Sequence, residues 1–543
     1  MQKGNIGVTT ENIFPIIKKF LYSDHEIFLR ELVSNAVDAT QKLNTLASIG
    51  EFKGELGDLT IHVELGKDTI TISDRGIGLT AEEIEKYINQ IAFSGATQFL
   101  EKYKDKTTED DMIGHFGLGF YSAFMVADEV HIDTLSWQKD AKPVHWECDG
   151  GTEYDMQDGT RTEVGTCITL FLNEDCLQFC NEYKATEVIK KYCSFMPVEI
   201  YVSRANTTET QTILASEKLD SDHVIEEVKK EKEEDPDKLK ITKRPELIND
   251  THPLWTKNPS ECTKEEYIDF YRKVFMDYKE PLFWIHLNMD YPFNLKGILY
   301  FPKINMEYES IEGVIKLYNN QVFIADNIKE VIPEFLLLLK GVIDCPDLPL
   351  NVSRSALQND GFVKKISDYI TKKVADKLSG MCKTQKEEYE KYWDDIAPFI
   401  KFGCLKDEKF CEKMTDYILF KNLDGKYMTL PECLEVNKTD PDEIQEGAVD
   451  ENGEKVEAEV VEDKSEDSAE EEKKDKTIYY VTDEKQQSQY INMFKAAKMD
   501  AVMLTDRIDQ PFISQLEAKN EGIHFARIDA DLTDAFKAKT SKK

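Results

Sequence analysis

Apolar and polar positions along the chain follow two periods, which predict where helices and strands lie. Residues 27–43 repeat with the helical period of about 100° per residue. The apolar stripe consists of Phe28, Leu32, Ala36, Ala39 and Leu43, and the polar stripe beside it consists of Glu31, Asn35, Asp38 and Lys42. This pattern predicts an amphipathic helix seated on a core. Asp24 precedes the first apolar positions and is the predicted N-cap.

Strand and helix patterns alternate over the rest of the first 205 residues. The predicted strands are 59–65, 69–73, 129–135 and 166–172, and a further helix is predicted over 185–192. Thr80 followed by Glu83 has the spacing of a capping box at a helix start. We therefore predict a first unit over residues 1–205 that combines helices and strands.

The pattern changes three times after this unit. Residues 206–246 contain a dense mixed-charge run, Glu226–Lys238, and are predicted to be a linker in which regular structure fades. A second unit over 247–436 has predicted strands near 281–293, 297–301 and 320–325 and a predicted helix over Glu334–Val342. Residues 437–476 include a tract of seventeen acidic residues and four lysines, which predicts a disordered insertion. Residues 477–543 begin with a β-α-β pattern, with its helix near 490–498 and its second strand near 501–504.

Length and composition limit the number of domains, the kinds of binding partner and the location of the protein. A chain of 543 residues is long enough for three or four domains at about 150 residues each. The 104 acidic and 68 basic residues give a net charge of −36, which argues against nucleic-acid and anionic-membrane partners. The eleven cysteines include no C-x-x-C pair, so ordinary thiols are favoured over a metal site. The first twenty residues lack the apolar core of a signal peptide, and we expect a cytoplasmic protein.

The helix over 27–43 carries the first candidate chemistry. Asn35 offers an oxygen ligand of the kind Mg²⁺ accepts, and Glu31, one turn earlier, could orient or deprotonate a water. The stripe alone is more typical of a solvated helix face.

Two glycine motifs suggest contacts to the base and to the phosphates of a nucleotide. Asp74-Arg-Gly-Ile-Gly78 follows a predicted strand, where Asp74 could accept a hydrogen bond from an exocyclic amine such as that of adenine. By itself this motif also fits a plain strand-to-helix turn. Gly114, Gly117 and Gly119 precede an apolar, helical segment, and such a loop can hold phosphate oxygens as a hinged lid. It is neither a Walker A loop nor a dinucleotide fingerprint.

Together these motifs, with Gly165-Thr166, resemble the nucleotide site shared by type II topoisomerases, sensor histidine kinases, mismatch-repair ATPases and one chaperone family. Four segments in order are similar to signatures of that chaperone family, the 90-kilodalton heat-shock proteins, in their bacterial form. They are Phe28–Ala36, His115–Ser122, Pro253–Thr256 and Leu350–Arg354. The resemblance implies an N-terminal α/β sandwich of the gyrase and histidine-kinase type, with helices on one face of a largely antiparallel sheet. It also implies an α-β-α middle domain.

The resemblance further implies an ATP-dependent chaperone with slow, gated hydrolysis, with ATP and Mg²⁺ as ligands. Glu31 would activate the water, Asn35 would reach Mg²⁺, and Arg354 would reach the γ-phosphate across the domain boundary. The other implied nucleotide contacts are Asn35, Asp38, Asp74, Gly78, Gly114, Gly117, Gly119, Phe120 and Thr166. Partners would be unfolded or partly folded client proteins.

Three departures from the family pattern qualify these expectations. Phe93 replaces a usual lysine near the nucleotide, and Tyr278 replaces an exposed tryptophan. The sequence for the family's C-terminal dimerisation domain is not seen, so we expect a monomer or weak dimer where the family forms a homodimer. A histidine kinase, a topoisomerase subunit and a nucleotide-binding scaffold without turnover are the alternatives, and an ATP turnover assay separates the scaffold from the ATPase.

Overall fold

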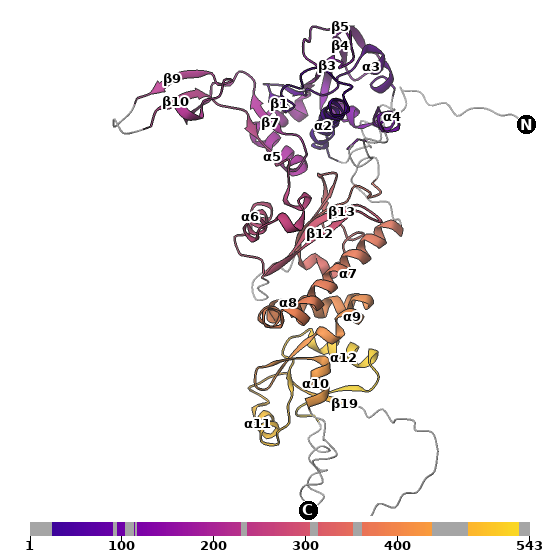
Figure 1. Ribbon diagram of the computed structural model, residues 1–543, viewed down its shortest axis with the longest axis vertical. Helices are drawn as coiled ribbons and strands as arrows, with labels where there is room; N and C mark the ends of the chain where they lie inside the picture. Colours follow the sequence, from indigo (N-terminus) through magenta and orange to yellow (C-terminus); the bar gives the residue numbers. More distant parts are fainter. Residues whose placement is uncertain are drawn as a thin grey trace, which may run out of the picture.

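The computed structural model describes residues 24–90, 95–103, 113–114, 117–229, 236–303, 313–350, 361–436 and 476–530. Figure 1 shows these parts succeeding one another along the long axis, from the N-terminal sheet to the last β-α-β region. None of the helices in these ranges has both the length and the apolar character needed to cross a membrane.

The N-terminal unit is built on an eight-stranded sheet with the order β11-β7-β1-β2-β6-β3-β4-β5. Its strands are β1 (Ile61–Leu65), β2 (Thr69–Ser73), β3 (Ala127–Leu135), β4 (Val144–Cys148), β5 (Asp155–Asp158), β6 (Gly165–Leu172), β7 (Ile200–Arg204) and β11 (Glu246–Leu247). Neighbouring strands are antiparallel except β1 and β7, which are parallel. The prediction of an α/β sandwich on a largely antiparallel sheet is confirmed.

The helices of this unit are α2 (Ile27–Ser48), α3 (Ala81–Tyr87), α4 (Gly95–Lys102) and α5 (Glu182–Cys193), together with the 3₁₀ segments η2 (Gly119–Met125) and η3 (Glu174–Cys180). In α2 the stripe residues Phe28 and Leu32 are fully buried, each contributing about 1.5–3 kcal/mol through burial. The N-cap position is Glu26, two residues after the predicted Asp24, and the Glu26 side chain makes no capping bond. Asp24 still contributes at the helix start, because its Oδ1 accepts a hydrogen bond from the Glu26 N–H at 3.1 Å. The capping box of Thr80 and Glu83 is confirmed at the start of α3.

The charged segment expected to lack regular structure forms a small sheet of its own, which projects sideways in Figure 1. Its strands are β8 (Thr210–Leu214), β9 (Val224–Val228) and β10 (Lys238–Thr242). Charges on facing strands pair, as Lys240 Nζ and Glu226 Oε1 do at 2.9 Å, and Ile241 is buried beneath them. The expectation of fading order was therefore wrong for the described part of this segment, because cross-strand pairs stabilise strands that are polar in sequence.

The middle unit has a five-stranded sheet with the order β12-β13-β16-β14-β15. The strands are β12 (Phe283–Met289), β13 (Leu295–Phe301), β14 (Ile315–Asn319), β15 (Val322–Asp326) and β16 (Lys340–Asp344). The helix predicted over Glu334–Val342 was wrong: a short 3₁₀ turn, η7 (Glu334–Leu338), leads into β16. A glycine there is required, because a Cβ on Gly341 would lie 2.9 Å from the carbonyl oxygen of Ile298 on β13.

Helices pack around this sheet and lead to the last unit. They are α6 (Lys264–Phe275), α7 (Gly361–Thr384), α8 (Lys386–Lys406) and α9 (Glu408–Met414), with the 3₁₀ turns η5 (Leu254–Thr256), η6 (Pro259–Glu261) and η8 (Thr415–Tyr417). Helix α10 (Leu430–Val436) belongs to the last unit, and the 3₁₀ turn η4 (Ala215–Glu217) follows β8 in the charged segment. The last sheet has the strand order β18-β17-β20-β19-β21. Its strands are β17 (Leu419–Asn422), β18 (Tyr427–Thr429), β19 (Lys476–Val481), β20 (Val502–Met503) and β21 (Ile523–Arg527), and the helices of this unit include α11 (Ser488–Ala496) and α12 (Asp509–Lys519). The β-α-β prediction is confirmed, since β19 and β20 are parallel and α11 connects them. The acidic tract lies outside the described residues.

Two large cores share the middle sheet. Ile298 and Tyr300 of β13 belong to the core that continues into the N-terminal unit. Leu299 and Phe301, on the opposite face of the same strand, belong to the core formed with α7 and α8. Phe195 joins the N-terminal unit to the middle unit, with its ring centroid 4.7 Å from that of Trp255.

Candidate functional site

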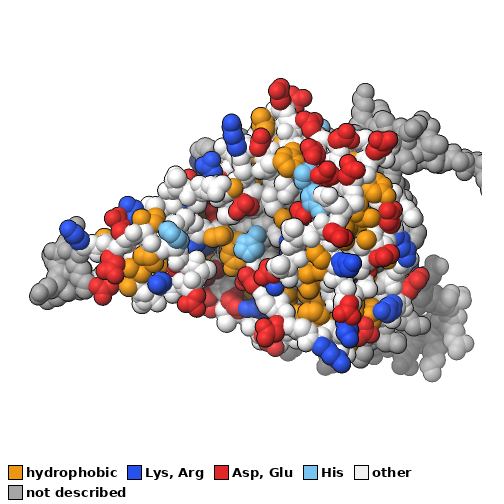
Figure 2. Space-filling view, turned by 90° about the horizontal axis from the view of Figure 1, so that it is seen from above, with side chains coloured by type: hydrophobic (Ala, Val, Ile, Leu, Met, Phe, Trp, Pro, Cys, Tyr) orange, Lys and Arg blue, Asp and Glu red, His pale blue; other side chains and the backbone are white. Residues whose placement is uncertain are grey.

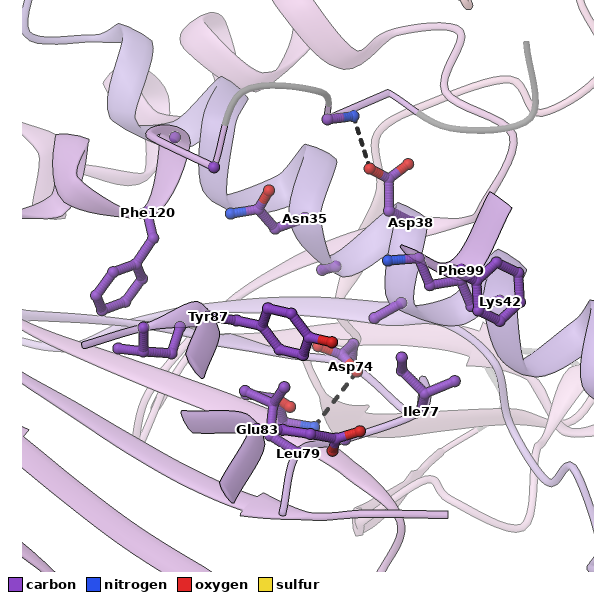
Figure 3. Close-up of a pocket in the computed structure, with 18 of the residues that line it drawn as sticks. Asn35, Asp38, Lys42, Asp74, Ile77, Leu79, Glu83, Tyr87, Phe99 and Phe120 are labelled. Carbon is purple, nitrogen blue, oxygen red and sulfur yellow. Dashed lines mark hydrogen bonds between the residues drawn. The ribbon is translucent and has the colours of Figure 1, made fainter. Parts of the chain in front are cut away.

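A cavity of about 440 Å³ lies between α2, the end of β2 and the segment around η2. Polar side chains from α2 and from the sheet point into it (Figure 3). Ten residues proposed from the sequence line it: Glu31, Asn35, Asp38, Asp74, Gly78, Gly114, Gly117, Gly119, Phe120 and Thr166. The eleventh, Arg354, lies outside the described residues, as does Phe93. The structure thus brings together residues that are up to 135 positions apart in the sequence.

Glu31 is held by its sequence neighbour. Its Oε1 accepts hydrogen bonds from Nε and Nη2 of Arg30 at 2.9 and 2.7 Å, and both side chains are almost fully buried. A Cβ on Gly119 would lie 2.7 Å from Glu31 Oε2, so the glycine allows η2 to approach this carboxylate closely. One carboxylate oxygen is therefore fixed by Arg30, while the other faces the glycine-rich segment.

Asp38, two helical turns further along α2, binds backbone rather than solvent. Its Oδ1 and Oδ2 accept hydrogen bonds from the N–H groups of Ile113 and Gly114, both at 2.7 Å. In Figure 3 a dashed line at the Asp38 carboxylate marks one of these two bonds, and the Asn35 carboxamide extends from the same helix beside it. Among the residues that the structure describes, no hydrogen bond to the Asn35 side chain is found, so its oxygen can take a ligand.

Asp74 is the buried carboxylate on the sheet side of the cavity. Its Oδ1 accepts hydrogen bonds from the N–H groups of Gly76 at 2.8 Å and Thr166 at 3.3 Å. Burial outweighs these two bonds and raises the pKa of Asp74 to about 6. An acceptor whose ionised form is this poorly solvated gains strongly from a ligand N–H donor.

Threonine hydroxyls and a glycine turn hold this part of the cavity in place. The Oγ1 atoms of Thr166 and Thr134 lie 2.9 Å apart, and Thr134 Oγ1 also accepts a hydrogen bond from the Leu79 N–H at 2.9 Å. Gly78 has φ of +60°, and a Cβ there would lie 2.0 Å from the Leu135 carbonyl oxygen. Only glycine fits at this position.

Sequence reasoning missed the aromatic and basic side chains that complete the cavity wall. Phe99 and Lys102 come from α4, Tyr87 from α3, and Lys42 from α2. Desolvation lowers the pKa of Lys42, although Asp38 and Glu83 oppose this effect. Lys42 could have been found, because it shares the polar stripe of Glu31 and Asn35. The residues on α3 and α4 carry no motif, and only the fold brings them to the cavity.

This fold and cavity define an ATPase domain of the class shared by several nucleotide-driven proteins. Residues 24–175 match the model of the histidine kinase-, DNA gyrase B-, and HSP90-like ATPases. Residues 178–470 match the model of the Hsp90 protein family.

Sequence similarity to curated relatives extends over the whole chain. The chain is 49% identical over 543 residues to the chaperone protein HtpG of Bacteroides thetaiotaomicron, covering all of this chain and 72% of that protein. It is 45% identical over 532 residues to the chaperone protein HtpG of Porphyromonas gingivalis, covering 98% of this chain and 70% of that protein. The chain therefore belongs to the Hsp90 family of ATP-dependent chaperones, as its motifs predicted.

Proposed function

We propose that ATP is hydrolysed in this cavity with its adenine at Asp74 and its phosphates between α2 and the glycine-rich segment. The observation that supports this most strongly is the placement of Glu31 and Asn35 on one wall and Asp74 on the other. A nucleotide bound in this way places its base and its phosphates against chemically matched groups. Gly78 and Thr166 would border the base, and Gly114, Gly117, Gly119 and Phe120 would border the phosphates.

The donor set at the phosphate end fits Mg²⁺. Asn35 presents an uncharged oxygen ligand, and Mg²⁺ takes few protein ligands beside substrate phosphates and waters. Asp38 is a poorer candidate, because both of its oxygens already accept backbone N–H groups. Bound Mg²⁺ would neutralise phosphate charge, and we assign its protein contact to Asn35. Asp38 instead acts by tethering the start of the glycine-rich segment to α2.

Glu31 is proposed as the general base. Arg30 orients the carboxylate through Oε1, which leaves Oε2 to accept a proton from a water near the γ-phosphate. Turnover would be gated by closure of the glycine-rich segment and by docking of the middle unit, which would bring Arg354 to the γ-phosphate like an arginine finger.

Chaperone clients would be unfolded or partly folded proteins. Tyr278 is 79% exposed but stands where the family carries a tryptophan, so we assign no client contact to it. A cytoplasmic location is supported by the cysteines, all eleven of which are free thiols. A histidine kinase is disfavoured, because none of the eight histidines in the described residues lies on a helix. The oligomeric state, predicted to be a monomer or weak dimer, can be measured by sedimentation velocity.

Three variants at two positions test this assignment. Glu31→Gln keeps the side-chain volume beside Arg30 and should retain ATP binding by calorimetry while hydrolysis falls about 10²–10⁴-fold. Arg354→Ala should likewise bind ATP yet turn over slowly, and Arg354→Lys should recover little, because lysine cannot make the bidentate contact. Full turnover in Glu31→Gln would remove Glu31 from the chemistry, and full turnover in Arg354→Ala would remove the interdomain contact.

A further inference from the structure

A cluster of two histidines and several carboxylates lies on the face of the N-terminal sheet that points away from the cavity. Along β3, Ile132 lines the cavity, so the alternate residues His131 and Asp133 point to the opposite face. The antiparallel register places His131 opposite Glu147 and Asp133 opposite His145. Figure 2 views this end of the molecule and shows pale-blue histidine side chains at the surface among red acidic ones.

The donor atoms of this cluster already converge. One ligand atom each from His131, His145 and Glu147 lies within 4.8 Å of the other two. Glu147 Oε2 is 3.3 Å from His145 Nε2 and 3.6 Å from His131 Nε2. Ligand atoms around a tetrahedral Zn²⁺ are about 3.4 Å apart, given bonds near 2.0–2.1 Å. Two of these separations therefore match the metal geometry, and side-chain rotation has to close only the third.

A second set of contacts orients the two imidazoles. His145 Nδ1 lies 2.7 Å from Asp133 Oδ1, so this nitrogen can donate its proton to the carboxylate and leave Nε2 as the metal-binding atom. The His131 ring packs on Phe171 of β6, with ring centroids 4.8 Å apart. Glu129 Oε1, 2.6 Å from His131 Nε2, can become the fourth ligand when a metal replaces the shared proton.

Charge and access favour a dication. Three carboxylates, those of Glu129, Asp133 and Glu147, surround two imidazoles, which leaves a negative excess even if both rings are protonated. The His131 and His145 side chains are 22% and 20% exposed, so an ion can reach them from solvent. We propose that His131, His145 and Glu147 bind one divalent transition-metal ion of the Zn²⁺ class on the outer face of β3 and β4. The bound ion cross-links these two strands.

Isothermal titration of the full chain, without an affinity tag, with ZnCl₂ tests the proposal. One ion should bind per chain and raise the melting temperature. His131→Gln and His145→Gln should each weaken binding at least about tenfold, and Asp133→Asn should weaken it about 10–100-fold by releasing the orienting contact. His62→Gln, a histidine on β1 outside the cluster, is the matched control and should bind as the parent does.

Thiols are the competing ligands, and Cys167 lies opposite Asp133 on β6. Cobalt absorption separates the two cases, because sulfur-to-metal charge transfer appears only when a thiolate binds. We expect a spectrum from nitrogen and oxygen ligands alone, unchanged in Cys167→Ser. The proposal fails if no ion binds, if the two histidine variants bind as well as His62→Gln, or if Cys167→Ser abolishes binding.

Discussion

At the residue scale, two of the three buried carboxylates that line the cavity, Glu31 and Asp74, lie in opposite electrostatic settings. Glu31 has a buried guanidinium beside it, whereas the Asp74 carboxylate accepts only backbone N–H groups, and Arg161 donates to the Asp74 backbone carbonyl oxygen at 3.0 Å. Burial outweighs the backbone N–H donors and Arg161 and raises the pKa of Asp74 to about 6, so its ionised form costs folding free energy. A residue kept in this state destabilises the empty protein and binds a donor tightly, which is the trade-off expected of a binding site.

Asp74→Asn should therefore change affinity and stability in opposite directions. The variant should bind ATP about 10–100-fold more weakly, because a charged acceptor contributes about 1.5–3 kcal/mol. Without nucleotide at pH 8 it should be more stable than the parent, by up to about 3 kcal/mol from the pKa rise of Asp74 from 3.8 to about 6. Calorimetric titration and thermal melts check the two effects.

The contribution of Asp74 to the folding free energy depends on pH, and the sign of this dependence follows from its raised pKa. The folded-state pKa is raised, so the cost of ionised Asp74 is complete above about pH 6 and disappears as the pH falls below the unfolded value of 3.8. The stability advantage of Asp74→Asn should shrink over the same window. Equal ATP affinity in the variant would show that Asp74 is not at the base, and a stability gain that persists at low pH would contradict the pKa assignment.

At the element scale, the site depends on how closely η2 approaches α2. Gly119 is the contact point, since a Cβ there would lie 2.7 Å from Glu31 Oε2. Gly119→Ala should displace the Glu31 carboxylate and lower turnover at least tenfold, with a smaller loss in ATP affinity. A steady-state ATPase assay together with calorimetry measures this split.

Gly380 in α7 provides the matched control, because a Cβ there meets nothing within 4 Å. Gly380→Ala should leave turnover unchanged and stabilise the helix by about 0.5–1 kcal/mol. Unchanged turnover in Gly119→Ala would show that the approach of η2 to Glu31 does not matter for the chemistry.

The acidic tract can be tested through the elements that flank it. Val436 ends α10 and Lys476 begins β19, and Lys476 Nζ lies 3.5 Å from Glu435 Oε1. The two ends are side by side, so a short glycine-serine linker can replace residues 437–475. We expect ATP turnover and melting temperature to stay within experimental error, and a melt displaced by several degrees would show that the tract packs on the protein.

Helix and strand periods predicted most elements of the first unit, because each buries one clear face. The charged strands β9 and β10 escaped prediction, since their pairing across the sheet is not visible in local sequence. Helices α7 and α8, the longest of the middle unit, were not predicted either. The site residues that carried motifs were found, whereas Phe99 of α4 reaches the cavity only through tertiary packing.

At the scale of the whole molecule, one core crosses from the N-terminal unit into the middle sheet. Phe195 lies at the crossing, buried against Trp255 and Tyr318. Phe195→Ala should cost about 3–5 kcal/mol, and calorimetry should show the N-terminal unit and the middle sheet melting earlier together.

Phe410→Ala, in the second core against Phe335, is the control of equal size. It should displace the transition of the α7–α9 region first. Independent melting of the N-terminal unit alone in Phe195→Ala would contradict a shared core.

The chain leaves the first sheet after β7 and returns to it at β11, which pairs with β7. Everything between Arg204 and Glu246 is therefore an excursion whose two ends are fixed by adjacent strands of one sheet. Doubling the length of such a loop costs only about 0.6 kcal/mol of closure entropy. The loops of this segment can thus change length almost neutrally as long as its small sheet is kept, and the same exit and entry points offer protein engineers a place to splice in a reporter domain.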